Sequence, residues 1–289
     1  MSVYKAKEFP EMDFSTQKEL FKHLRDNHDR LIKNKKATFK STDSIAAIDF
    51  TIDQVKQSVE KSQAVEKFDF MRPEMVYPVI NTINYLDSHN DVHAMGMWNK
   101  SAEEQNGKTL WIVNHNLEIG SEVAYEKDVN IIVKEMTFKD LGYDSSLKTQ
   151  ALIFETPKSA IVNDRIKDRI EKNIPTQHSI RMQYVKVLFA MDSSEKEDEE
   201  YKATYDKYIN QIANKEKARE QAYFWVVTEA KIASEGSSVI QGSNDITPML
   251  IGKSIEPSKG TQSDEPSADT HKEEARKRVL LNMAKLANK

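Results

Sequence analysis

The sequence contains no cysteine, and this absence excludes three kinds of chemistry. Without thiol groups the chain can form no disulfide bond, no thiolate nucleophile and no cysteine-ligated zinc site. A chain of 289 residues without any cysteine has no covalent support suited to an oxidising environment. We therefore expect it to work in a reducing compartment.

Long apolar runs and a strong net charge are also absent. No run approaches the roughly 18 consecutive apolar residues that a membrane-spanning helix needs. Residues 1–5 lack the apolar core of a signal peptide, so we expect no secretion. The net charge is −4, which gives no basic excess for binding nucleic acid. We expect a globular protein with neither a membrane nor a specific nucleic acid as partner.

The composition divides the chain into three parts. Residues 1–44 are predicted to be a helical segment, in which Thr16 and Glu19 have the spacing of a capping box. Residues 45–251 form a β-rich domain large enough for one sizeable core. Residues 252–289 begin with a Ser/Pro/Gly/Asp-rich stretch without periodicity, predicted to be a flexible linker, and end in a short amphipathic basic helix.

The middle part has many short strand-like runs separated by turn residues. Strands are expected at 45–52, 76–86, 92–98, 109–113, 122–125, 129–133, 151–154, 179–191 and 223–233. Helices are expected at 53–67, from Pro157 through Ile170, and in a charged amphipathic insertion at 194–221. This order predicts an α+β, mainly β fold: a closed or partly closed antiparallel β-barrel of about seven strands surrounded by helices.

Three segments carry a base, a nucleophile and a carboxylate, each at the end of a strand-like run. His115 lies in the first, Ser179 in the second and Glu235 in the third. A serine hydroxyl is a poor nucleophile until a neighbouring base removes its proton, and a carboxylate can orient that base. These residues therefore indicate acyl transfer by an activated serine. The alternative is an ordinary strand serine, a structural histidine and a solvated turn carboxylate.

Three nearby residues compete for roles in this group. His178 directly precedes Ser179, but consecutive side chains of a strand project to opposite faces, so His115 is the better base. His178 is kept as a fallback third member. Ser237, together with Ser238, is the fallback nucleophile.

Arg181 is a candidate contributor to the oxyanion hole. Its guanidinium, or a backbone N–H beside it, could stabilise the negative charge that develops on the substrate carbonyl. An ordinary surface arginine is the alternative.

The segments resemble the motifs of the prohead, or capsid-maturation, serine proteases of tailed bacteriophages, whose barrel fold is related to herpesvirus assemblin. Gly96-Met97-Trp98 is similar to an early strand of that family, and the likeness covers residues 75–248. Arg181 stands where the family has glycine. The matching motifs are His115 with Ile119-Gly120, Ser179-Ile180-Arg181-Met182, and Glu235-Gly236-Ser237-Ser238-Val239.

The resemblance implies a serine endopeptidase with a triad of Ser179, His115 and Glu235 and no metal or nucleotide cofactor. It implies work inside the immature capsid in the host cytoplasm, on extensions of the scaffold and major capsid proteins and on the chain itself, with possible self-association. Residues 252–270 would be a region for self-cleavage.

Two alternatives remain from the sequence. One is a catalytically inactive scaffold or capsid-assembly factor with the same barrel. The other is a metal-dependent hydrolase built on the cluster of Asp87, His89, Asp91 and His93.

Overall fold

The computed structural model describes residues 3–40 and 70–252, which belong to one compact unit. The strand expected at 45–52, the helix expected at 53–67 and the tail from residue 253 lie outside the described residues. The strands are β1 (Tyr4–Ala6), β2 (Phe9–Phe14), β3 (Phe39–Lys40), β4 (Met75–Thr82), β5 (Asp91–His93), β6 (Leu110–Val113), β7 (Glu122–Ala124), β8 (Asn130–Thr137), β9 (Lys148–Pro157), β10 (Gln177–Met191), β11 (Tyr223–Val239) and β12 (Met249–Ile251). The helices are α1 (Gln17–Asp26), α2 (His28–Ala37), α4 (Asn99–Gln105), α5 (Asp164–Glu171), α6 (Glu199–Tyr208) and α7 (Lys215–Gln221), with short 3-10 turns η1 (Glu126–Asp128), η2 (Lys139–Leu141), η3 (Lys158–Ala160), η4 (Lys196–Asp198) and η5 (Ile209–Gln211).

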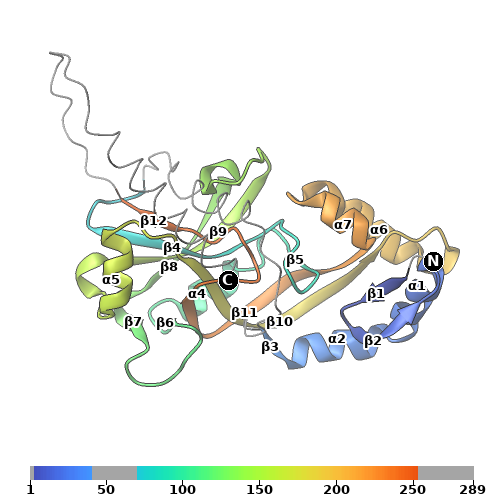
Figure 1. The fold of residues 1–289 in the computed structure, drawn as a ribbon, viewed down its shortest axis with the longest axis horizontal. Coiled ribbons are helices and arrows are strands. Elements are labelled where there is room, and N and C mark those ends of the chain that lie inside the picture. The colour runs from blue at the N-terminus through green and yellow to red at the C-terminus, as the bar shows by residue number, and fades with distance from the viewer. Residues whose placement is uncertain (1–2, 41–69, 253–289) are drawn as a thin grey trace, which may run out of the picture. The chain divides into compact units, whose positions relative to one another are not determined.

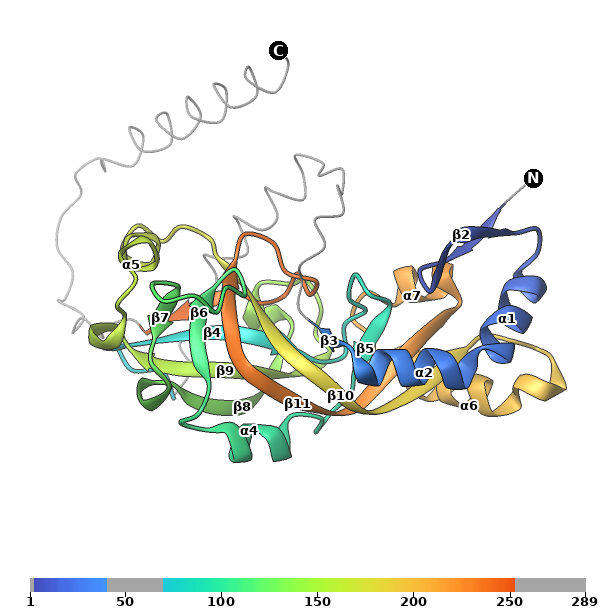
Figure 2. The same ribbon diagram turned by 90° about the horizontal axis from the view of Figure 1, so that it is seen from below.

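The largest sheet is built around β10 and β11, which run antiparallel and side by side (Figure 1 and Figure 2). Its six strands follow the order β3-β10-β11-β6-β7, and β5 also pairs with β11. Both β5 and β6 are parallel to β11, so this sheet is mixed. The 17 residues of β11 let its outer edge pair with β5 in its first part and with β6 in its last part.

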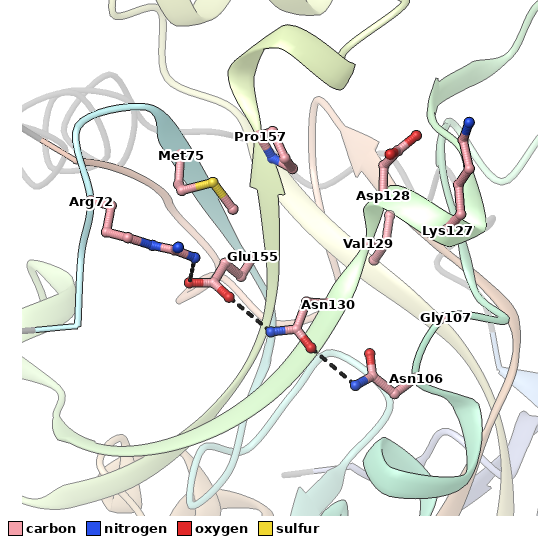
Figure 3. A pocket seen from close by; sticks show the side chains of 10 residues that line it. All are labelled: Arg72, Met75, Asn106, Gly107, Lys127, Asp128, Val129, Asn130, Glu155 and Pro157. Carbon is pink, nitrogen blue, oxygen red and sulfur yellow. Dashed lines mark hydrogen bonds and ion pairs between the residues drawn. The ribbon is translucent and has the colours of Figure 1, made fainter.

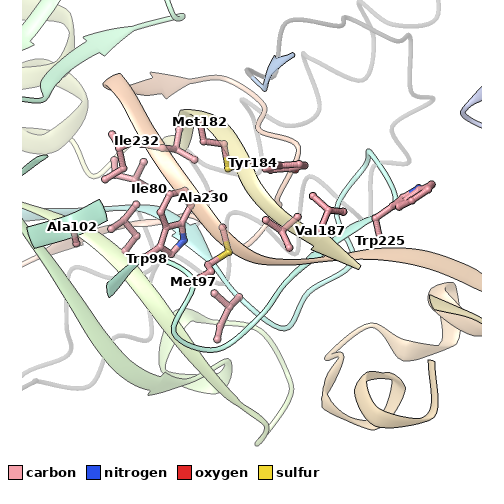
Figure 4. Close-up of a cluster of buried hydrophobic side chains, with 14 of the residues drawn as sticks. Ile80, Met97, Trp98, Ala102, Met182, Tyr184, Val187, Trp225, Ala230 and Ile232 are labelled. Atoms are coloured by element: carbon pink, nitrogen blue, oxygen red, sulfur yellow. The ribbon is translucent and has the colours of Figure 1, made fainter. Parts of the chain in front are cut away.

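The second sheet has four strands in the order β12-β4-β9-β8, all antiparallel. Every residue of β4 is buried, as expected for a strand covered on both faces. Apolar side chains fill the space between the sheets, among them Ile80 of β4, Met182 of β10 and Ile232 of β11 (Figure 4). Trp98, from the turn before α4, is fully buried in the same cluster.

The predicted α+β class, with more strand than helix, is confirmed, whereas no closed barrel is found among the described strands and the all-antiparallel arrangement is wrong. The described strands form open sheets, and none of these sheets closes into a ring. The two parallel pairings of β11 also contradict an all-antiparallel arrangement. The larger sheet ends at β3 on one side and at β7 on the other, and these two strands do not pair with each other.

The N-terminal segment is helical only after a hairpin that the prediction missed. Strands β1 and β2 pair, and Phe9 and Phe14 at the ends of β2 are buried. The Thr16 half of the capping box is confirmed at α1: the hydroxyl of Thr16 accepts a hydrogen bond from the Glu19 amide at 3.1 Å. The Glu19 carboxylate in turn accepts from the amide of Ser15 at 3.0 Å. Helix α1 packs inward through buried residues such as Leu24.

The two later helical predictions are confirmed with changed boundaries. The insertion at 194–221 contains α6 and α7, and Tyr205, Ile209 and Ile212 pack with β11 residues in one buried cluster. Pro157 ends β9 instead of opening a helix. Helix α5 begins after Asn163, whose side chain caps the helix by accepting from the amide of Ile166.

No helix in the described ranges combines the length and apolar character that crossing a bilayer requires.

Candidate active site

The three predicted motif segments meet where β6, β10 and β11 lie side by side. The last residues of β11 pair with β6 in parallel, so that Ser237 is the partner of Ile112. On the other edge of β11, Ser237 is the partner of Ser179 of β10. His115 follows β6 by two residues. The fold therefore brings together segments that are far apart in the sequence.

His115 and Glu235 are in direct contact, although 120 residues separate them in the sequence. Nδ1 of His115 lies 2.7 Å from Oε1 of Glu235, and the two side chains are 3% and 0% exposed. A carboxylate can only accept a hydrogen bond, so Nδ1 carries the proton. When the ring has its proton on Nδ1, Nε2 is the ring nitrogen that can act as a general base. The contact has the geometry of a base and the carboxylate that orients it.

The backbone that carries His115 is held in an uncommon conformation. Asn114 and His115 have φ angles of +54° and +53°, in the left-handed region. For residues other than glycine this region costs about 1–2 kcal/mol per residue and is kept only where the surroundings fix it. Here the amide of Asn114 donates to the carbonyl of Ser238 at 3.0 Å. The amide of His115 donates to the hydroxyl of Ser237 at 2.9 Å. Strand β11 thus fixes the turn that presents the imidazole.

Ser179 lies on the face of the sheet that carries the His115–Glu235 pair. Residues directly opposite each other in an antiparallel pair project to the same face, with Cβ atoms about 4.5–5.5 Å apart. Ser179 is opposite Ser237, and Ser237 contacts both Glu235 and the amide of His115. Ser179 is 7% exposed. The sheet register therefore places Ser179 on the same face of the sheet as Ser237 and Glu235.

The hydroxyl of Ser237 both donates and accepts a hydrogen bond. It donates to Oε2 of Glu235 at 2.9 Å and accepts from the amide of His115. Its side chain is fully buried. A hydroxyl held in this way is poorly suited to attack a substrate.

His178 and Ser238 lie on the opposite face of the same strands. The ring Nδ1 of His178 donates to the carbonyl of Thr247 at 2.9 Å, and the ring lies edge-on to Trp111. The indole N–H of Trp111 also donates to the hydroxyl of Ser238. Burial lowers the pKa of His178 to about 4, so the ring is neutral near pH 7. These contacts direct His178 away from the His115–Glu235 pair.

Arg181 stands beside an irregularity in the β10–β11 pairing. The register shifts between Ile180 and Met182, and Ser234 on the facing strand has a φ of +72°. The guanidinium of Arg181 lies 5.1 Å above the ring of Phe39 in β3. This cation–π contact gives the side chain a partner on β3. Its contribution to an oxyanion hole stays a prediction.

The residues of the alternative metal site are used in structural interactions. One carboxylate oxygen of Asp87 accepts from the amides of His89 and Asp91 at 2.8 and 2.9 Å, which is the usual role of aspartate in a turn. Nδ1 of His93 is 3.1 Å from the side-chain oxygen of Asn81. Within residues 3–40 and 70–252, no group of three or more His, Asp or Glu side chains could hold a metal ion. The structure does not support a metal-dependent hydrolase at this turn.

A separate cavity of about 550 Å³ lies between the start of β4, the end of β9 and the connection from β7 to β8 (Figure 3). Four of its polar side chains form a chain of contacts. Arg72 pairs with Glu155 at 2.9 Å, Asn130 donates to the same carboxylate at 2.8 Å, and Asn106 donates to Asn130 at 3.0 Å. None of the candidate triad residues lines it. The cavity is therefore not the site to which the sequence points.

Comparisons of the chain with protein-family models, with curated proteins and with solved structures give no match. The functional assignment therefore depends on the geometry of the site and on the three motif segments. What the motifs did not reveal is the pair of hydrogen bonds made by Ser237. Its position two residues after Glu235 was the available signal, because residues i and i+2 of a strand share a face.

Proposed function

We propose that the protein is a serine endopeptidase of the prohead type, related to assemblin. It cleaves extensions of phage scaffold and major capsid proteins, and its own chain, inside the immature capsid in the host cytoplasm. The observation that carries the proposal is the buried hydrogen bond between His115 and Glu235 on the face of the sheet that bears Ser179.

The chemistry follows from the positions of these groups. The hydroxyl of Ser179 attacks the scissile carbonyl while Nε2 of His115 takes its proton. The carboxylate of Glu235 stabilises the imidazolium that forms, and the ring then delivers the proton to the leaving amine. Water then attacks the acyl-enzyme while His115 takes its proton, and the ring returns that proton to the oxygen of Ser179 as the acid product leaves. A backbone N–H near Arg181, or its guanidinium, stabilises the oxyanion.

Coexpression with the scaffold and major capsid proteins of the encoding phage tests the proposal. Ser179→Ala is expected to abolish their processing, because loss of a triad member lowers turnover by about 10⁴–10⁶-fold. Ser238→Ala is the matched control, since this buried serine of β11 faces Trp111 instead of the site. Processing that survives Ser179→Ala would refute the assignment and leave the inactive assembly factor.

A second experiment needs no substrate. A fluorophosphonate probe phosphonylates an activated serine with loss of fluoride, and peptide mapping by mass spectrometry identifies the labelled residue. We expect the label on Ser179, and none in His115→Gln. Labelling of Ser237 instead would reassign the nucleophile.

A further inference from the structure

Ser237 links the two partners of the candidate base. Its hydroxyl donates to Oε2 of Glu235 at 2.9 Å, while the other oxygen of that carboxylate is 2.7 Å from Nδ1 of His115. The same hydroxyl accepts from the backbone amide of His115 at 2.9 Å. The Ser237 side chain thus contacts both the carboxylate of Glu235 and the backbone of His115, the residue that this carboxylate orients.

These contacts close a ring of hydrogen bonds inside the protein. Glu235 and Ser237 are both fully buried, where an unsatisfied polar group is costly and a satisfied network is rigid. The turn at Asn114 and His115 has two consecutive positive φ angles, so it depends on such anchors. Removing the hydroxyl frees one oxygen of Glu235 and one amide of the turn together.

We propose that Ser237 is a positioning residue that sets the orientation of the His115–Glu235 pair. It acts through these two residues and does not contact the substrate. The inference rests on the proposed endopeptidase function, because orientation of the base matters only if His115 activates Ser179.

The neighbouring serine provides a matched control. Ser238 is also buried in β11, and its hydroxyl also has a hydrogen-bond partner, the indole N–H of Trp111 at 2.9 Å. Ser237→Ala and Ser238→Ala therefore each remove one hydroxyl of the same strand. Only the first disturbs the His115–Glu235 pair.

The test compares these variants by labelling kinetics and by proton NMR. With the fluorophosphonate probe, Ser237→Ala should lower the maximal labelling rate of Ser179 by about 10–100-fold and leave the half-saturating probe concentration unchanged. The low-field signal of the His115 Nδ1 proton, assigned by its loss in His115→Gln, should shift or broaden in Ser237→Ala. Ser238→Ala should retain both the rate and the signal.

The outcomes separate the two proposals. An unchanged rate and an unchanged signal in Ser237→Ala would overturn the positioning role, whatever Ser179→Ala does. A rate as low in Ser238→Ala as in Ser237→Ala would also overturn it, because the loss would then be a general effect of weakening β11. Continued processing in Ser179→Ala would refute the endopeptidase function. The NMR result would then report only whether Ser237 affects the contact between His115 and Glu235.

Discussion

Gly236 of β11 lies directly against the ring of Phe154 on β9. A Cβ atom at position 236 would be 2.7 Å from Cε2 and 2.8 Å from Cζ of that ring, and 3.0 Å from Cγ2 of Ile80. Phe154 and Ile80 are buried, so neither has open space into which it can move. This contact between the two sheets falls between Glu235 and Ser237, the residues that hold His115.

The first prediction follows from this contact. Gly236→Ala should lower the free energy of unfolding by about 1–3 kcal/mol, because a methyl group is forced into a filled space. It should also reduce labelling of Ser179, since β11 must move. Urea unfolding measures the first effect. In a double-mutant cycle with Phe154→Leu, the smaller side chain should recover part of the loss. Additive losses would show that the ring contact is not the cause.

A second prediction concerns the charge of Glu235. Glu235→Gln keeps the size of the side chain but presents an amide to both His115 and Ser237. The amide cannot stabilise the imidazolium, so processing should fall by about 10³–10⁴-fold while the protein stays folded. The exposed Glu135→Gln of β8 is the control, measured in the same coexpression assay. Full activity of Glu235→Gln would remove the glutamate from the triad.

The sequence brought His115 and Glu235 forward as partners, and the structure places these two side chains in contact. The Glu235 segment had two interpretations, a family motif and a solvated turn, and the structure contradicts the second, because Glu235 is fully buried within β11. Ser234 takes a positive φ at a register irregularity, yet β11 continues to Val239. The residues around Ser234 therefore have the local features of a turn. Whether a strand ends or forms a bulge there depends on the strands with which it pairs.

The parallel pairings and the turn at His115 could not be predicted in the same way. Strands β5 and β6 pair with different parts of β11, a choice set by long-range packing that leaves no periodic signal in either short strand. The positive φ values of Asn114 and His115 depend on anchors more than 100 residues away, such as Ser237. The capping box at Thr16 was predictable because all its groups lie within one helical turn.

A third prediction concerns the contact between α2 and the sheet. Lys35 forms an ion pair with Asp91 in which both side chains are buried, and the Tyr184 hydroxyl donates to the same carboxylate at 2.8 Å. Lys35→Met removes the ammonium group that faces this carboxylate, so the free energy of unfolding should fall by about 3–5 kcal/mol. Lys33→Met, on the exposed side of α2, should change it by less than about 0.5 kcal/mol. Urea unfolding of both variants measures the two changes in the free energy of unfolding. Equal losses in the two variants would contradict the role of the ion pair.

The last prediction is a loss of stability in acid that depends on His178. Burial lowers the pKa of this ring from 6.5 to about 4, because the buried ring disfavours the charged form. The unfolded chain therefore binds a proton at a higher pH than the folded protein does. Stability contributed by the neutral ring is complete above about pH 7 and is lost as the pH falls towards about 4, by up to about 3 kcal/mol. Burial also lowers the pKa of His93, which adds a loss of the same sign.

Urea unfolding between pH 7 and pH 4.5 measures this slope. In His178→Gln the titrating group is gone, so the free energy of unfolding should fall less steeply with decreasing pH, by the uptake of about one proton. The variant will be less stable at pH 7, because the ring packs against Trp111 and donates to Thr247. The slope and not the absolute value is therefore the test. An equally steep fall in His178→Gln would show that the buried ring is not what makes the protein sensitive to acid.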